Sequence, residues 1–145
     1  MTQTELRHLL AAARTIAVLG AHPDPSRAAF YVPDYLWRHG YRILPTNPVF
    51  AGQTLWGERV RADLSEILEP VDILDVFRRS DALPTHLEGI LALRPKLVWL
   101  QSGIRNDAFA RTLEELGIGV IQDRCLMVVH RQLLGAWDRS SSRGR

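Results

Sequence analysis

Five short apolar runs, separated by longer amphipathic segments, constrain the fold of this chain more than any other feature of its sequence. Most of these runs are continuously apolar, without the alternation that marks a strand with one face in water. Such strands are buried on both faces, and the intervening segments are long enough to form crossover helices. The runs lie at residues 15–20, 41–46, 71–77, 96–101 and 118–123. The sequence therefore predicts an α/β fold in which helices cover both faces of a five-stranded parallel sheet.

The segments between the runs carry helix signals. Thr2 or Thr4 can cap the first helix, and Gly40 and Gly117 follow two others as helix ends. Right-handed crossovers then favour a doubly wound sheet, but periodicity leaves the strand orders 3-2-1-4-5 and 2-1-3-4-5 both open. We expect helices at residues 2–13, 28–39, 81–93, 105–116 and 126–134, a short helix at 64–68, and a long loop at 47–60.

Length and composition predict one domain at residues 1–138, followed by a disordered basic tail at residues 139–145. The single cysteine excludes an internal disulfide and suits a reducing compartment. No signal peptide and no apolar run of membrane-spanning length is visible, so we expect a cytoplasmic protein without a membrane partner. The net charge is only +2 and the basic residues are scattered, which argues against nucleic acid.

The first apolar run ends in a corner that is suited to an anion. Gly20 lets the backbone approach a ligand closely, and the helix start that follows favours a phosphate. Arg27 stands where a guanidinium can hold that phosphate, and Ala21 and Ser26 belong to the same loop. The alternative is an ordinary loop in which Ser26 caps the helix and Arg27 is solvated.

Polar or glycine-bearing corners also follow the other four runs, and one binding crevice explains them more economically than separate turns. The G-x-G-x-x-G fingerprint is absent, and no acidic residue ends the second run, which argues against NAD and flavin-adenine dinucleotide. The alternative is a set of turns with a core phenylalanine and surface arginines. The corners are Thr46, Asn47 and Pro48; Phe77, Arg78 and Arg79; Gln101, Ser102 and Gly103; and Asp123, Arg124 and Cys125.

In these corners the chain resembles small CoA-binding proteins related to the amino-terminal domain of the succinyl-CoA synthetase alpha subunit. The resemblance covers roughly residues 10–135. It implies a three-layer, Rossmann-like, doubly wound fold with strand order 3-2-1-4-5, and coenzyme A as the ligand. It implies binding without a reaction, because the synthetases need further domains for theirs. The strings that carry it are IAVLGAHPDPSR, GYRILPTNP, VDILDVFRRS, VWLQSGIRN and DRCLMVVH.

The resemblance also implies which residues contact the ligand. Gly20, Ala21, Ser26 and Arg27 would hold phosphates, Asn47 and Pro48 the adenosine, Phe77 and Arg78 the nucleotide, and Gln101 and Gly103 the pantetheine. Two departures from the family pattern stand out. Relatives often carry a basic residue after the asparagine–proline pair, where this chain has Val49, and Ala28–Ala29 replaces a proline–serine pair. Arg59 or Arg78 would then have to replace the lost partner of the 3′-phosphate.

Two other functions stay open on the sequence. An enzyme acting on an adenine nucleotide or acyl-CoA needs a general base, and only His22, Asp24 and Asp123 qualify by position. The second function is an interaction subunit that kept the fold and lost the ligand, and its support is the missing basic residue after Asn47–Pro48. We expect no catalytic residue and no metal site, since no cysteine or histidine pair has ligand spacing. The expected partner is therefore a small nucleotide.

Several single residues have competing interpretations. Cys125 could form a mixed disulfide with the cofactor thiol, or it could simply pack the last helix. His130 is expected to be a packed or capping residue, and His8, His39 and His86 are expected to be solvated on helices. Trp56 and Trp137 could mark the surface of a homo-oligomer, although single exposed aromatic residues are also normal.

Overall fold

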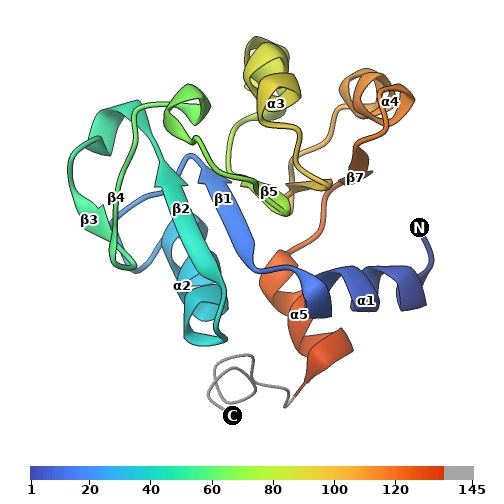
Figure 1. Cartoon of the computed structure of the whole chain (residues 1–145), viewed down its shortest axis with the longest axis horizontal. Coiled ribbons are helices and arrows are strands. Elements are labelled where there is room, and N and C mark those ends of the chain that lie inside the picture. Colours follow the sequence, from blue (N-terminus) through green and yellow to red (C-terminus); the bar gives the residue numbers. More distant parts are fainter. Residues whose placement is uncertain (136–145) are drawn as a thin grey trace.

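A computed structural model describes residues 1–135 of the chain (Figure 1). The predicted tail at 139–145 and Trp137 lie outside the described residues. The expected α/β class with a five-stranded parallel sheet is confirmed. Its strands are β1 (Thr15–Leu19), β2 (Arg42–Thr46), β5 (Ile73–Val76), β6 (Leu97–Leu100) and β7 (Gly119–Ile121).

Helices cover both faces of this sheet and complete the expected three-layer, Rossmann-like arrangement (Figure 1). One face packs against α1, α2 and α5, and the other against η2, α3 and α4. Within residues 1–135, no helix combines the length and apolar character needed to cross a membrane. The α-helices are α1 (Gln3–Ala12), α2 (Ala28–Arg38), α3 (Leu87–Leu93), α4 (Asp107–Glu115) and α5 (Leu126–Leu134), and the 3-10 helices are η1 (Pro48–Phe50), η2 (Leu64–Glu66) and η3 (Ser80–His86).

The predicted strand order 3-2-1-4-5 is wrong. The observed order is β2-β1-β5-β6-β7, which is 2-1-3-4-5 when the strands of the main sheet are counted along the chain. The outer edge of β2 is already occupied, because the amide of Asn47 donates to the carbonyl of Arg61, and the amide of Arg61 donates to the carbonyl of Pro45. The third strand therefore pairs with the free edge of β1, where Asp72 accepts the amide of Thr15 at 3.1 Å.

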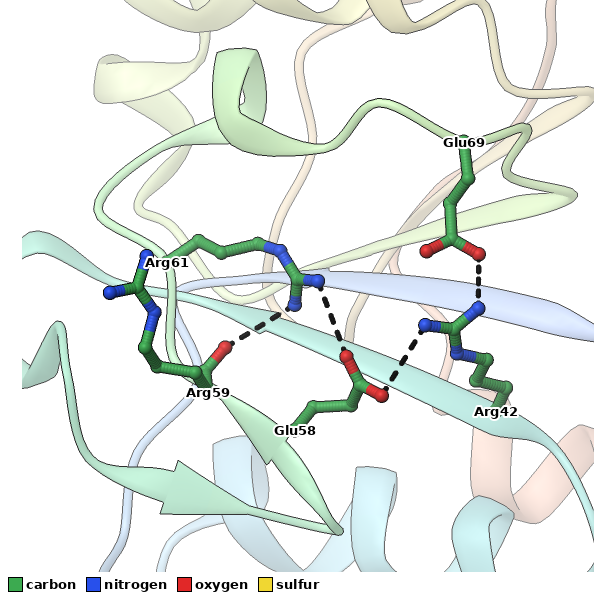
Figure 2. Close-up of polar contacts among 5 residues, drawn as sticks. All are labelled: Arg42, Glu58, Arg59, Arg61 and Glu69. Atoms are coloured by element: carbon green, nitrogen blue, oxygen red, sulfur yellow. Dashed lines mark hydrogen bonds and ion pairs between the residues drawn. The ribbon is translucent and has the colours of Figure 1, made fainter.

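The segment that covers the edge of β2 is a hairpin in a region that the sequence predicted to be a loop. It consists of β3 (Thr54–Leu55) and β4 (Glu58–Arg59), paired antiparallel. Figure 2 shows how Glu58 accepts from Arg42 at 3.3 Å and from Arg61 at 3.2 Å, while Arg42 also pairs with Glu69. Single surface ion pairs stabilise little, but here one carboxylate, that of Glu58, joins the hairpin to β2 through Arg42, and Arg42 in turn reaches Glu69.

Trp56, at the turn of this hairpin, is not an exposed aromatic residue. Its side chain is only 9% exposed and its Nε1 donates to Asp34 on α2 at 3.1 Å. Its ring lies beside that of Phe30, with centroids 5.5 Å apart. The prediction that Trp56 marks an oligomer surface is therefore wrong, because this side chain anchors the hairpin to α2.

Two helices contain a proline, and one of these prolines explains where an observed helix differs from the expected one. Pro84 lies within the predicted helix 81–93, and the structure has the 3-10 helix η3 there before α3 begins at Leu87. Pro33 lies in the middle of α2 and, because it has no amide hydrogen, cannot bond to the carbonyl of Ala29. The amide of His22 donates to that carbonyl at 3.3 Å, which fastens the loop after β1 to α2.

Candidate functional site

The carboxyl ends of β1 and β5 form the point where the strand order reverses, and Gly20 lies at this point. Gly20 has φ +93, and a Cβ there would come within 2.6 Å of the carbonyl oxygen of Phe77. The two strand ends therefore approach more closely than any residue with a side chain allows. In doubly wound folds this is the place where ligands bind.

A first cavity of about 320 Å³ opens on the β2 side of this point. We call it the β2-side cavity. It contains Asn47 and Pro48, as the sequence predicted, and two carboxylates that sequence reasoning missed. Its lining includes Gly20, Asn47, Pro48, Asp63, Leu64, Arg78, His86 and Glu88.

A second cavity of about 480 Å³ opens on the other side, between the start of α2 and the end of β6. We call it the β6-side cavity. Both cavities fall in the size range of small-molecule sites. Its lining includes Ala28, Tyr31, Phe77, Arg78, Arg79, Gln101, Gly103 and Cys125.

Arg78 lines both cavities and is the residue that connects them. Its Nε donates to Nε2 of His86 at 3.3 Å, so His86 is not the solvated histidine that the sequence predicted. Burial, and then the positive charge of Arg78, lower the pKa of His86. A neutral His86 can accept this bond and orient the guanidinium without adding a charge.

The first turn of α2 offers backbone donors to the β6-side cavity. Arg27, not Ser26, is the residue that precedes this helix, and its side chain makes no capping bond. The amides of Ala28 and Ala29 have no acceptor among residues 1–135, and Ala28 lines the cavity. Free amides at the positive end of a helix, with Arg78 and Arg79 in the lining of the same cavity, are groups that can bind an anion.

Three predicted phosphate contacts lie outside both cavities. Ala21 is fully buried, and its amide and that of Gly20 both donate to the carbonyl of Thr46, at 3.1 and 2.9 Å. Ser26 is exposed and is bound to Asp24, whose pKa is lowered mainly by the backbone hydrogen bond from Ser26. Arg27 is exposed and its contact with a phosphate stays a prediction.

The structure brings the other seven predicted residues to the cavities. Asn47 is held in place because its Nδ2 donates to the carbonyl of Ala21 at 2.9 Å. Gln101 is 4% exposed, and its Oε1 accepts the amide of Leu126 at the start of α5. The amide of Gly103 donates to Asp123 at 2.6 Å, so this amide is not available to a ligand.

The residues that sequence reasoning missed come from η2, η3 and α3. Asp63 precedes η2 and accepts the amide of Ser65 at 2.7 Å, and Glu88 lies in the first turn of α3. None of these residues directly follows a strand of the main sheet, so looking for polar residues at strand ends does not find them. Pro84 was the sequence signal that could have found His86, because a proline inside the predicted helix 81–93 indicates that residues near it do not form a regular α-helix.

The three general-base candidates are engaged in local bonds, and none of them lines either cavity. His22 accepts the amide of Asp24 at 3.0 Å and stacks edge-on against Phe50. Asp123 holds the amide of Gly103. Within residues 1–135, no three His, Cys, Asp or Glu side chains gather as a metal site would require.

Comparison with known proteins places the chain in a family. The family model described as a CoA binding domain matches residues 14–131. An uncharacterised Bacillus subtilis protein, YneT, is 34% identical over 129 residues, which is 89% of this chain and 94% of that protein. The cell-free ID.343 protein of Thermus thermophilus is 60% identical, with a TM-score of 0.90 over 92% of this chain and 99% of that one.

More distant structures share the fold. A hypothetical protein from Pyrococcus horikoshii is 30% identical, with a TM-score of 0.86 over 93% of this chain and 94% of that one. A dinucleotide-forming acetyl-coenzyme A synthetase from Korarchaeum cryptofilum is 20% identical with a TM-score of 0.66, over 80% of this chain but 27% of its own. At that identity the likeness concerns the fold alone. From the extent of the family match, the chain belongs to the CoA-binding domain family.

Proposed function

We propose that this chain binds coenzyme A, or an acyl-coenzyme A, across Arg78 as a stand-alone module without catalysis of its own. The adenosine occupies the β2-side cavity, the pantetheine arm occupies the β6-side cavity, and the diphosphate lies between them. The observation that carries this proposal is that Arg78 lines both cavities. A ligand with an anionic centre and two unlike arms matches this arrangement.

The start of α2 supports the place of the diphosphate. The amides of Ala28 and Ala29 have no acceptor among the described residues, and Arg78 and Arg79 line the same cavity as Ala28. Charge-assisted bonds from guanidinium groups and helix amides are the strongest contacts that such a site can offer a phosphate. The amides of Gly20 and Ala21 are engaged by the carbonyl of Thr46, so the amides of Ala28 and Ala29 are the backbone donors proposed for the diphosphate.

The 3′-phosphate that distinguishes coenzyme A has few partners. Asp63 and Glu88 line the β2-side cavity and repel an anion, whereas Arg78 is the cation of its lining. Arg59, the other predicted substitute, lines neither cavity; Figure 2 shows its guanidinium turned away from Glu58. We therefore expect the 3′-phosphate to add little to the affinity.

We propose that the chain has no catalysis of its own because its candidate general bases are engaged in local hydrogen bonds. His22, Asp24 and Asp123 are each held in a local bond, outside the cavity linings. A cytoplasmic location, a homo-oligomeric state and the lack of nucleic-acid and membrane partners stay predictions of the sequence.

Isothermal titration of the reduced, full-length protein with CoA, dephospho-CoA, ADP and NAD tests the proposal. We expect CoA and dephospho-CoA to bind with similar affinity, ADP more weakly because it lacks the pantetheine arm, and NAD not at all. A chain that binds none of the four would contradict the proposal and favour a ligand-free interaction subunit. Chemical conversion of any of these ligands during the titration would favour an enzyme.

A further inference from the structure

The wall of the β6-side cavity contains the one cysteine of the whole sequence, Cys125. Cys125 is partly exposed and directly precedes α5, and its side chain makes no capping hydrogen bond with that helix. Cys125 thus packs against the core on one side and lines the cavity on the other. A cysteine in a cavity wall is not in itself a binding site, so the argument for a ligand beside Cys125 depends on the neighbouring groups.

Gln101 provides a second, independent sign of a ligand in this cavity. Its side chain lines the cavity and is 4% exposed. Its Oε1 accepts the amide of Leu126 at 3.0 Å, while its Nε2 has no acceptor among residues 1–135. An amide carbonyl of the ligand would supply the acceptor, and a pantetheine arm carries two amides followed by a thiol.

We propose that Cys125 forms a mixed disulfide with the thiol of coenzyme A bound in this cavity. The inference rests on the proposed function, because the pantetheine arm must occupy the β6-side cavity. The amide of Leu126 donates to Oε1 of Gln101, and Cys125 directly precedes Leu126. A pantetheine amide bonded to Gln101 would therefore lie near the start of α5, where the thiol is. Cys125 would thereby retain CoA covalently when the cofactor pool is oxidised.

The reaction is a thiol–disulfide exchange with the symmetrical disulfide of CoA as co-reactant. The thiol of Cys125 loses its proton to solvent, and the Sγ thiolate attacks one sulfur of the CoA disulfide. The new bond joins Sγ to that sulfur, the CoA–CoA sulfur bond breaks, and one CoA leaves as a thiolate. Cys125 is oxidised and the departing CoA is reduced, so no further oxidant is needed. A reducing thiol reverses the step.

Intact-mass spectrometry of the full-length protein with CoA disulfide tests the inference. We expect one CoA adduct per chain that a reducing thiol removes, and none in Cys125→Ser, whose folding is checked by its thermal unfolding midpoint. The adduct should form at least about tenfold faster than that with cystamine, a small disulfide without the nucleotide, because binding positions the reacting sulfur. Equal rates with both disulfides would overturn the inference.

The binding site must direct this reaction. Arg78→Gln should slow adduct formation with CoA disulfide about tenfold or more while leaving the rate with cystamine unchanged. Arg111→Gln is the matched control, because Arg111 is an exposed arginine on α4 that lines neither cavity. If reduced CoA binds by titration but no adduct forms, the inference fails and the proposed function stands. If reduced CoA does not bind either, both fail.

Discussion

The two faces of the sheet are packed differently, and each lies beneath one of the two cavities. The core on the α3 and α4 face consists entirely of hydrocarbon side chains. The core on the α1, α2 and α5 face also contains Tyr41, Trp56 and Trp99, and Asp75 and His130 are fully buried as well. His130 accepts or donates a bond with the hydroxyl of Tyr35 at 2.9 Å, so it is the packed residue that the sequence predicted.

Asp75 shows the difference most clearly. Along β5, Leu74 and Val76 belong to the hydrocarbon core, whereas Asp75 between them points to the opposite face. Both of its carboxyl oxygens are buried without a hydrogen-bond partner among the described residues. Both faces therefore stabilise the fold with buried hydrocarbon, but the face under the β6-side cavity also contains a buried, unpaired carboxyl group that costs stability.

Substitutions at adjacent positions on β5 should have opposite effects. Leu74→Ala removes buried hydrocarbon and should lower the free energy of unfolding by about 3 kcal/mol. Asp75→Val removes an unpaired polar group and should raise it by about 1–2 kcal/mol. Urea denaturation of both variants and the wild type measures the contrast. Losses of equal size at both positions would break the comparison between the faces.

The same contrast has a pH dependence. Burial raises the pKa of Asp75 well above its value of 3.8 in an unfolded chain, so the folded state keeps this proton to higher pH. Stability is then lost as pH rises above the unfolded value towards the folded one. We expect the advantage of Asp75→Val over the wild type to grow as the pH is raised from about 4. An advantage that stays constant over this range would show that the carboxyl is not buried.

Two glycines, one in each cavity, test the close approach at the strand ends. Gly20→Ala should cost about 3 kcal/mol, because the methyl group meets the carbonyl of Phe77 and the backbone has positive φ. Gly103→Ala should cost about 1 kcal/mol, because φ is +84 but nothing lies within 4 Å of its Cβ. Chemical denaturation separates the two values. If they agree, the contact between Gly20 and Phe77 contributes nothing.

Arg78 lines both cavities, so its removal should weaken ligand binding. Arg78→Ala removes charge-assisted contacts with the diphosphate and should weaken CoA binding by about 10- to 100-fold. Arg111→Ala should leave the affinity unchanged, since this residue lines neither cavity. Titration calorimetry measures both. An Arg78 variant with wild-type affinity would place the diphosphate elsewhere, with Arg27 as the next candidate.

The smallest effect is expected at the mouth of the β2-side cavity. Val49 is 77% exposed and directly follows Pro48, which lines the cavity. Val49→Lys should improve the affinity for CoA over dephospho-CoA by about threefold, the contribution of one exposed ion pair. Parallel titrations of both ligands check this ratio, with Leu116→Lys on the exposed end of α4 as the control.

The apolar runs predicted every strand of the main sheet, because burial on both faces leaves a continuous local signal. They did not predict the hairpin of β3 and β4, whose two-residue strands are too short to show any period. Seven of the ten predicted site residues line the cavities, since each follows a strand that ends in the crevice. Asp63, His86 and Glu88 were missed because they reach the site from segments between the strands.

By itself the sequence determined the layered α/β class and the corners where a ligand could bind, since both follow from periodicity and residue type within short segments. Only the tertiary structure decided the strand order, because the segment ending at Arg61 occupies the edge of β2 and leaves β5 to pair with β1. It also decided that the amides of Gly20 and Ala21 are engaged by Thr46 while those of Ala28 and Ala29 stay free. Such choices depend on contacts between segments far apart in the chain, and a local pattern does not contain them.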